Sequence, residues 1–292
     1  MVELKNEFLK VELHPKGAEI ISITGMQDGL NYMWRRDPIQ WANSAPILFP
    51  IVGAVRNDQY TIDGKTYHMT QHGFARHTEF KTDQKSETQV TFTLESNDEI
   101  KKQYPYLFAL NVTYTLEANK LHCEISIKNT DSKEIYFQVG GHPAFACPLL
   151  DNESSNDYYI EFSDNENKGR KIIDVAKRGM SRNVEPFFEN ERRFFVRQDL
   201  FSRDAIVLQD FVSKSISLKS LNHNKSLVFY MNGFDHVGIW AAKHVGGLIA
   251  IEPWVGHADY VDFGGDFKDK QSCVQLQPDQ HFDCDFAIEI NQ

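Results

Sequence analysis

Apolar residues recur at every second position in segment after segment of this 292-residue chain. The pattern occupies residues 9–13, 90–94, 110–116, 121–127, 158–162 and 282–290. Alternation at period two puts one set of side chains on a core face and the other on a solvent face, which is typical of β-strands. Turn-forming residues separate these segments at 117–120, 129–132 and 222–225. The sequence therefore predicts an all-β protein, one large antiparallel β-sandwich.

Helical signals are few. Asn97 is a good N-cap for one short helix that runs through Gln103 and is stopped by Pro105. The absence of a long segment with helical periodicity counts against an alternating β–α–β architecture. We expect the polar stretch at 163–170 to be a loop. Because the sequence has no internal repeat and no Gly/Ser-rich linker, we expect a single domain that spans residues 1–292.

The charge balance excludes several classes of partner. The chain has 31 basic and 41 acidic residues, a formal net charge of −10. Nucleic acids and anionic membrane surfaces both require a basic patch, so neither is an expected partner. The N-terminus has no apolar signal segment, and no run approaches the ~20 apolar residues of a membrane span. The four cysteines are irregularly spaced, which disfavours a zinc site or a disulfide framework. We therefore expect a cytoplasmic protein.

A candidate ligand site begins with a hairpin. Asp63-Gly64, flanked by alternating residues, is a strong signal for two antiparallel strands joined by a tight turn. Arg56 and His72 are nearly equidistant from this turn, so strand pairing is expected to bring a guanidinium and an imidazole to the same end of the ladder. Two such donors suit an oxygen-rich ligand.

A second candidate is His142, in the sequence Gly-Gly-His-Pro that follows a strand-like segment. The paired glycines allow close backbone approach, and Pro143 fixes the exit from the histidine. Histidine is well suited to proton transfer near neutral pH. The alternative is a sharp turn that contains a histidine without a chemical role.

A third candidate is Glu252, at the end of the apolar run 248–251. A continuous apolar run predicts a strand that is buried on both faces. A lone buried carboxylate is costly, so Glu252 must be paired, hydrogen-bonded or facing a cleft. Burial also raises the pKa of a carboxyl group, which suits a general base. The alternative is a salt-bridged glutamate at a strand end.

Together, Arg56, His72, His142 and Glu252 offer two donors, an acid and a base from strand ends or adjacent loops. Two histidines and a carboxylate can also bind a metal ion, but no closely spaced histidine pair lies near Glu252, so we expect no metal. Four aromatic residues near these segments can offer flat faces to a sugar, although most aromatic residues in such a chain belong to the core. They are Phe74, Phe145, Trp254 and Tyr260.

At these residues the chain resembles the aldose 1-epimerase (galactose mutarotase-like) family, in particular its LacX-type and hexose-6-phosphate 1-epimerase-like branch. The resemblance spans nearly the whole chain. The His-Gly-Phe-Ala-Arg string is its most specific motif. The matching segments are 49–56, 71–76, 141–143 and 251–254.

The resemblance implies an all-β supersandwich with a sugar site on its concave face. The residue matching Glu252 takes the proton from the anomeric hydroxyl, and the residue matching His142 protonates the ring oxygen. The ring opens, the C1–C2 bond rotates and the ring recloses with C1 inverted. Residues matching Arg56 and His72 bind sugar oxygens. The expected activity is cofactor-independent anomerisation of a free hexose or a hexose 6-phosphate.

Further binding residues follow from the same resemblance. The family has a substrate-binding aspartate upstream of the glutamate; Asp204 fits its order better than Asp235 does, although Asp204 is equally well explained as a turn residue. Arg76 can pair with a sugar phosphate or form a salt bridge in its loop. Trp254 is expected to contact the sugar.

Two other functions stay open. One is a non-catalytic carbohydrate-binding protein that uses the same cleft. The other is a β-sandwich domain of a polysaccharide-active enzyme, which the lack of a secretion signal disfavours.

Overall fold

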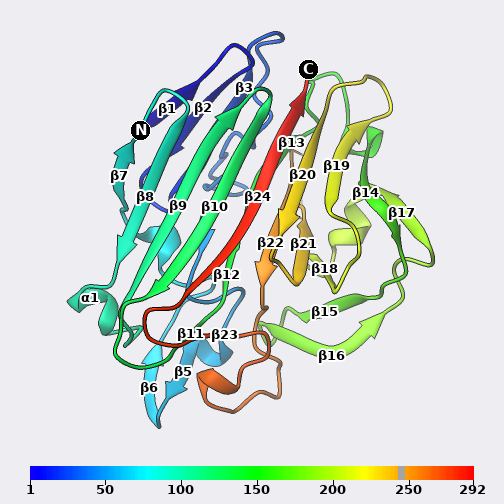
Figure 1. The fold of residues 1–292 in the computed structure, drawn as a ribbon. Helices are drawn as coiled ribbons and strands as arrows, with labels where there is room; N and C mark the ends of the chain where they lie inside the picture. The colour runs from blue at the N-terminus through cyan, green and yellow to red at the C-terminus, as the bar shows by residue number, and fades with distance from the viewer. Residues whose placement is uncertain (243–246) are drawn as a thin grey trace.

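The computed structural model describes residues 1–242 and 247–292, and two antiparallel sheets dominate this part of the chain (Figure 1). The larger sheet has nine described strands in the order β17 (Glu191–Phe195), β14 (Tyr158–Glu166), β19 (Ser215–Ser220), β20 (Ser226–Asn232), β24 (His281–Asn291), β10 (Lys120–Asn129), β9 (Phe108–Glu117), β8 (Gln89–Glu95) and β7 (Lys81–Gln84).

The second sheet runs in the order β16 (Gly179–Glu185), β15 (Arg170–Asp174), β18 (Ile206–Gln209), β21 (His236–Trp240), β22 (Gly247–Val255), β12 (Val139–Gly141) and β4 (Ile47–Leu48), with β13 (Ala144–Cys147) also paired to β22. Smaller sheets join β1 (Val2–Lys5), β2 (Leu9–His14) and β3 (Glu19–Gly25), then β5 (Gln59–Ile62) with β6 (Lys65–His68), and β11 (Ile135–Phe137) with β23 (Val274–Leu276).

The described helices are short. One is α-helical, α1 (Asp98–Lys101), and the others are single 3-10 turns, η1 (Arg56–Asp58), η2 (Ala75–His77), η3 (Ser155–Asp157), η4 (Gln198–Phe201) and η5 (Phe267–Asp269). The side chain of Asn97 accepts hydrogen bonds from the amides of Glu99 and Ile100, so the predicted cap is confirmed. The helix is shorter than predicted, because it ends at Lys101 and not at Gln103.

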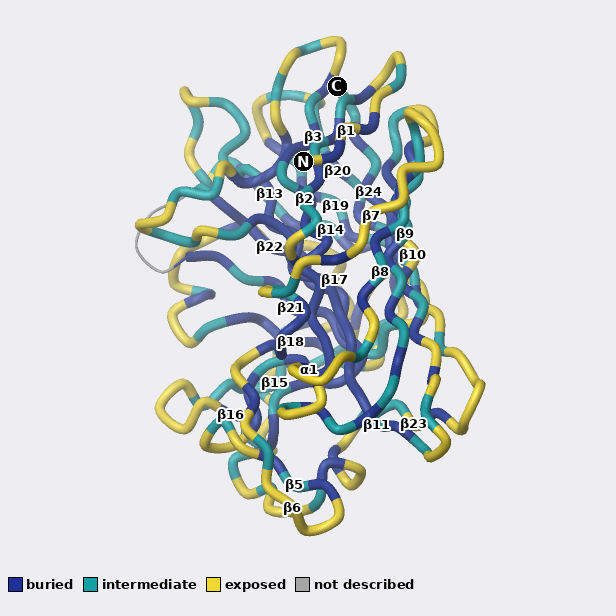
Figure 2. The backbone as a smooth tube through the Cα atoms, turned by 90° about the vertical axis from the view of Figure 1, so that its left-hand side faces the viewer, coloured by how far each residue is buried: buried dark blue, intermediate teal, exposed yellow. Residues whose placement is uncertain are grey.

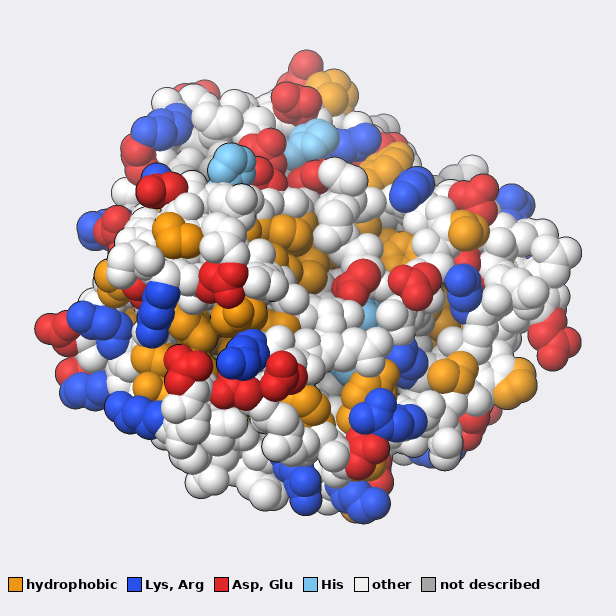
Figure 3. Space-filling model, turned by 60° about the horizontal axis from the view of Figure 1, so that its bottom comes forward, with side chains coloured by type: hydrophobic (Ala, Val, Ile, Leu, Met, Phe, Trp, Pro, Cys, Tyr) orange, Lys and Arg blue, Asp and Glu red, His pale blue; other side chains and the backbone are white. Residues whose placement is uncertain are grey.

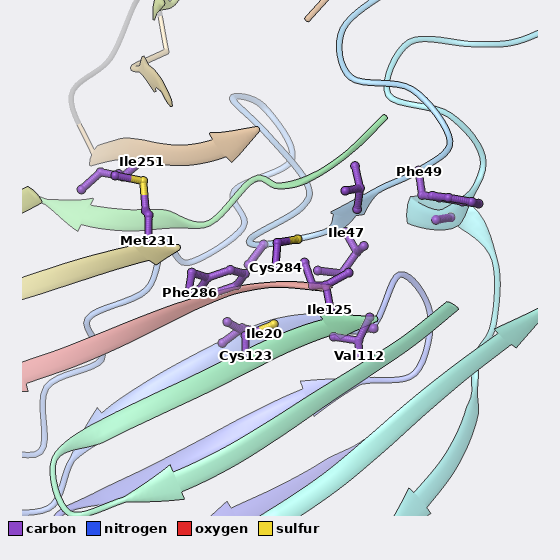
Figure 4. Packing of buried hydrophobic residues seen from close by; sticks show 14 of the residues in the cluster. Ile20, Ile47, Phe49, Val112, Cys123, Ile125, Met231, Ile251, Cys284 and Phe286 are labelled. Atoms are coloured by element: carbon purple, nitrogen blue, oxygen red, sulfur yellow. The ribbon is translucent and has the colours of Figure 1, made fainter. Parts of the chain in front are cut away.

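The alternating segments form the expected strands. In β9, Leu110, Val112 and Tyr114 are fully buried, while the residues between them are partly exposed. The core lies between the sheets: Figure 4 shows Cys123 of β10 and Phe286 of β24 among the side chains packed there. β24, the C-terminal strand, pairs with β10 on one side and β20 on the other. β24 therefore occupies a central position in the larger sheet.

The polar stretch at 163–170 departs from the prediction. β14 continues to Glu166, so the first part of this stretch is strand and not loop. The carboxylate of Glu166 is fully buried and accepts hydrogen bonds from the amides of Val212, at 3.1 Å, and Ser213, at 2.8 Å. These amides satisfy the carboxylate, so this polar residue can be buried within a strand.

The surface is polar and mixed in charge. Figure 2 shows exposed residues gathered at the loops and at the β5–β6 hairpin, around a buried interior. Figure 3 shows acidic and basic side chains interspersed over one end of the molecule. Cys123, Cys147, Cys273 and Cys284 are free thiols. In the described part of the chain, no helix is long and apolar enough to span a membrane.

Candidate active site

β22 presents side chains to two different environments. Ile249, Ile251 and Val255 pack in the main core between the sheets. Leu248 and Ala250 belong to a separate apolar cluster, and Trp254 to a third. This arrangement explains the continuous apolar run in the sequence, because the strand is covered on both faces. Glu252 shares the parity of the second set and therefore points away from the main core.

The indole of Trp254 lies across the neighbouring strands, and two glycines make room for it. A Cβ atom added to Gly238 of β21 would come within 2.7 Å of the six-membered ring of this indole. A Cβ atom added to Gly140 of β12 would lie 2.9 Å from its Cδ1 atom. Gly238 is also the cross-strand partner of Glu252. The glycines thus fix the indole beside the carboxylate.

A cavity of about 410 Å³ opens on this face, within the size range of small-molecule sites. Its polar and aromatic lining includes Trp41, Gln71, His72, Arg76, His142, Arg178, Asp204, Trp240, Glu252 and Trp254. Within residues 1–242 and 247–292, four buried polar atoms of this lining find no hydrogen-bond partner, namely Arg76 Nε, His142 Nδ1, Glu252 Oε2 and Trp254 Nε1. Buried polar atoms are normally satisfied, so this cluster indicates a site for a polar ligand.

His142 and Glu252 face one another in the cavity. His142 sits between β12 and β13, where its amide donates to the carbonyl of Pro46 at 3.1 Å. Its Nε2 lies 3.2 Å from Oε2 of Glu252, without hydrogen-bond alignment. Burial lowers the pKa of His142 to about 3 and, together with the charge of Asp204, raises the pKa of Glu252 well above its usual value. Burial in this cavity thus favours the uncharged form of both groups.

His72 is held in a fixed orientation. Its backbone is left-handed, with φ of 66°, and its Nδ1 accepts a hydrogen bond from the amide of Gly53 at 3.1 Å. Burial and the neighbouring His142 keep the pKa of His72 well below its usual value, so the imidazole is neutral. Since Nδ1 is an acceptor, the neutral ring carries its hydrogen on Nε2, which lies 3.3 Å from the side-chain amide of Gln71 at the cavity wall.

Arg56 does not share this site, and the structure corrects the expected pairing with His72. The hairpin forms, with left-handed Asp63 and Gly64 at its turn, but its ladder ends at the Gln59–His68 pair. Left-handed conformations at residues 57 and 58 then turn the chain away.

The Arg56 side chain is therefore exposed outside the cavity, and its guanidinium donates to the carbonyl of Phe263 at 3.3 Å. Its amide donates to Asp259, whose carboxylate also pairs with the buried Lys270 at 2.6 Å. Arg56 thus bonds to Phe263 and Asp259 and does not line the cavity.

The two candidate aspartates occupy different places. Asp204, at a left-handed turn before β18, lines the cavity. Asp235 lies outside the cavity, where its carboxylate accepts from the amide of Gly256 at 3.0 Å and lies 2.9 Å from Nδ1 of His236. The geometry therefore favours Asp204 as the aspartate that contacts a ligand.

Arg76 and Trp254 line the cavity as expected, whereas Phe74 and Phe145 belong to the main core and Tyr260 packs in a satellite cluster. Among residues 1–242 and 247–292, no three His, Cys, Asp or Glu side chains are grouped as metal ligands.

Four of the polar and aromatic residues named in the described lining were not predicted. Gln71 adjoins His72 in a motif that was recognised, and this adjacency was an available signal. Trp41, Arg178 and Trp240 come from distant parts of the chain, and local sequence carries no signal that unites them. The guanidinium of Arg178 pairs with Asp58 at 2.9 Å at the edge of the cavity.

Comparisons with known proteins agree with this architecture. The profile of the aldose 1-epimerase family matches residues 1–275. The chain belongs to the aldose 1-epimerase family. It is 34% identical over 290 residues to the chromosomal protein LacX of Lactococcus lactis, covering 95% of each chain. Membership of this family supports an isomerase of the mutarotase type.

Two solved structures resemble this epimerase-family chain over nearly their full length. A galactose mutarotase related enzyme from Lactobacillus acidophilus superposes with a TM-score of 0.93 at 31% identity, covering 99% of this chain and 97% of that chain. A galactose mutarotase-like protein from Lactobacillus casei gives 0.93 at 30% identity, with both chains fully covered. The expected all-β, galactose mutarotase-like fold is thus confirmed.

Proposed function

We propose that this protein is an aldose 1-epimerase that interconverts the α and β anomers of a hexose or hexose 6-phosphate. The observation that carries the proposal is the pairing of His142 with Glu252 in a cavity whose buried polar atoms lack partners. An acid and a base at one point are the groups that ring opening requires.

The chemistry uses one proton shared by the pair. In the reactive form Glu252 is a carboxylate and His142 is an imidazolium. Glu252 takes the proton of the anomeric hydroxyl, His142 gives its proton to the ring oxygen, the C1–O5 bond breaks and C1 becomes a carbonyl. Rotation about C1–C2 and reversal of both transfers yield the other anomer.

Burial contributes to the opening step. The step starts from a charged pair and leaves both Glu252 and His142 neutral. The pKa directions of both residues show that this environment disfavours charge on either of them. Ring opening therefore relieves the cost of holding an ion pair in a buried site. The proposed reaction needs no cofactor.

Binding is assigned to the rest of the lining. His72 donates through Nε2, Asp204 accepts from sugar hydroxyls, and Trp254 offers an apolar face. Arg76 supplies a cation with an unpartnered Nε, which suits a hydroxyl or a phosphate oxygen. We therefore propose a hexose 6-phosphate as well as a free hexose as the substrate.

An anomerisation assay tests the proposal. Purified protein is added to freshly dissolved α-anomers of free and phosphorylated hexoses, and optical rotation or the anomeric proton NMR signal is followed. We expect acceleration over buffer for at least one sugar and its loss in Glu252→Gln, since general acid–base groups contribute about 10²–10⁴-fold. Asp235→Asn is the control, because this carboxylate lies outside the cavity. No acceleration with any hexose refutes the activity.

A non-catalytic sugar-binding protein is the second candidate. The unpartnered polar atoms of the cavity would bind a polyol whether or not it reacts. Calorimetric binding of a hexose without anomerisation, or anomerisation that persists in Glu252→Gln, favours this alternative.

A further inference from the structure

Aromatic rings enclose the imidazole of His142 from separate parts of the chain. The indole of Trp41 lies 4.5 Å from it, centroid to centroid, with 31° between the planes. The rings of Trp240, at 5.8 Å and 79°, and His72, at 5.7 Å and 81°, meet it nearly perpendicularly. Trp41 is therefore the aromatic neighbour whose ring lies nearest to the imidazole and is inclined least to it, in a tilted face-to-face contact.

The position of Trp41 is set by its own surroundings. It lies in the irregular segment 35–46, where its carbonyl accepts a hydrogen bond from Nε1 of Trp34 at 2.8 Å. Its amide donates to the carbonyl of Asp37 at 2.8 Å. Trp34 is 1% exposed, so this anchor is part of the packed protein. The edge contact of Trp41 with Trp240, at 5.9 Å, fixes the indole from a second side.

The charges around His142 show what the indole face can contribute. Glu252, 3.2 Å away on β22, favours the imidazolium. Burial and the cation of Arg76 in η2 oppose it, and His72 is neutral. The face of an indole attracts a cation, more strongly where water is excluded. Trp41 therefore adds to the carboxylate of Glu252, when that group is ionised, in favouring a protonated His142.

We propose that Trp41 is a positioning residue that holds the imidazole of His142 toward Glu252 and stabilises its protonated form through the indole face. This inference rests on the proposed function, because the protonated imidazole matters only if His142 delivers a proton to the sugar. It assigns a role in the reaction to a segment that carries no recognised motif.

Two substitutions of Trp41 distinguish the effect of an aromatic face from the effect of side-chain size. Trp41→Phe keeps an aromatic face, whereas Trp41→Leu keeps only an apolar side chain. We expect Trp41→Leu to lower kcat about tenfold, the effect of a desolvated cation–π contact on protonation, and Trp41→Phe to lose less. KM should change little in either variant. Ile39→Ala is the matched control, because Ile39 is in the same turn and 91% exposed.

The outcomes decide the proposal. Wild-type kcat in Trp41→Leu, equal losses in the Leu and Phe variants, or a loss confined to KM each overturn it; the last result makes Trp41 a sugar platform. Thermal unfolding checks that each variant is folded, and Trp41→Met replaces Trp41→Leu if that variant is not. An inactive wild type refutes the proposed function itself, whereas an active wild type with a fully active Leu variant refutes the role of Trp41 alone.

Discussion

Nε2 of His142 and Oε2 of Glu252 lie 3.2 Å apart in a site where burial moves the pKa values of the two residues in opposite directions, to about 3 for His142 and well above the usual value for Glu252. Between these limits the pair holds one proton. The proposed reaction uses the form of this one-proton pair in which the proton has moved from Glu252 to His142. We expect kcat/KM to fall near pH 3, where a second proton binds, and at high pH, where the shared proton leaves. Polarimetry across this range, corrected for spontaneous mutarotation, checks the profile. A loss of activity centred near pH 6.5 would contradict it.

Asp204 should control the alkaline limb of this profile. Its negative charge helps raise the pKa of Glu252. Removing that charge in Asp204→Asn lowers the pKa of Glu252. The pair then loses its shared proton at a lower pH, so the alkaline limb of the kcat/KM profile shifts to lower pH. KM should rise in the same variant if Asp204 binds the sugar. Asp235→Asn, outside the cavity, should leave the limb in place, and an equal shift in both variants would remove the explanation.

The free energy of unfolding should fall as pH rises, because the pKa of Glu252 is raised in the folded protein. Its folded pKa lies above its unfolded value, so its contribution to folding is fully present below about pH 4.5 and is lost as pH rises toward the folded pKa. Glu252→Gln removes this dependence. We expect the variant to gain on the order of 1–3 kcal/mol of unfolding free energy relative to the wild type between acid and alkaline pH. Urea unfolding at several pH values measures the difference; a difference that is constant with pH would contradict it. One transition is expected if residues 1–292 form one domain.

The strands could be predicted because their signal is local. Period-two alternation in β9, β10 and β24 is independent of the rest of the fold. Glu166 shows the limit of this approach. Its carboxylate is buried because it accepts hydrogen bonds from the amides of residues 212 and 213. These residues lie in the connection between β18 and β19, far from Glu166 in the sequence.

The candidate site was predictable in part. His142 and Glu252 each stood out locally, but their meeting depends on the packing of β12, β13 and β22, and their roles came from family resemblance. Arg56 was misplaced because non-glycine residues adopted left-handed conformations just before the hairpin. Such conformations are uncommon outside glycine, although asparagine and aspartate are enriched in them.

Gly238 should be intolerant of a side chain. A Cβ atom there would lie 2.7 Å from the Trp254 indole, and Gly238 is opposite Glu252 on the adjacent strand. Gly238→Ala must push the indole into the cavity or move the strand, at about 1–3 kcal/mol for an overpacked site. We expect lower thermal stability and a raised KM. Gly264→Ala is the control, because its added Cβ atom meets nothing within 4 Å. Equal tolerance of both substitutions would show that the indole position is not fixed by Gly238.

Substitutions of His72 and Arg56 should have different effects on sugar affinity, although the sequence predicted that the two residues lie together. His72 presents a hydrogen-bond donor to the cavity, whereas the Arg56 side chain bonds to the carbonyl of Phe263 outside it. Loss of a hydrogen bond to a neutral ligand group costs about 0.5–1.5 kcal/mol, so His72→Gln should weaken sugar binding by about two- to tenfold. Arg56→Ala should leave the sugar affinity within about twofold, since its amide bond to Asp259 does not need the side chain. Calorimetric titration with the best substrate of the anomer panel measures both effects. A larger loss of affinity in Arg56→Ala than in His72→Gln would return Arg56 to the binding site and contradict the geometry of the hairpin.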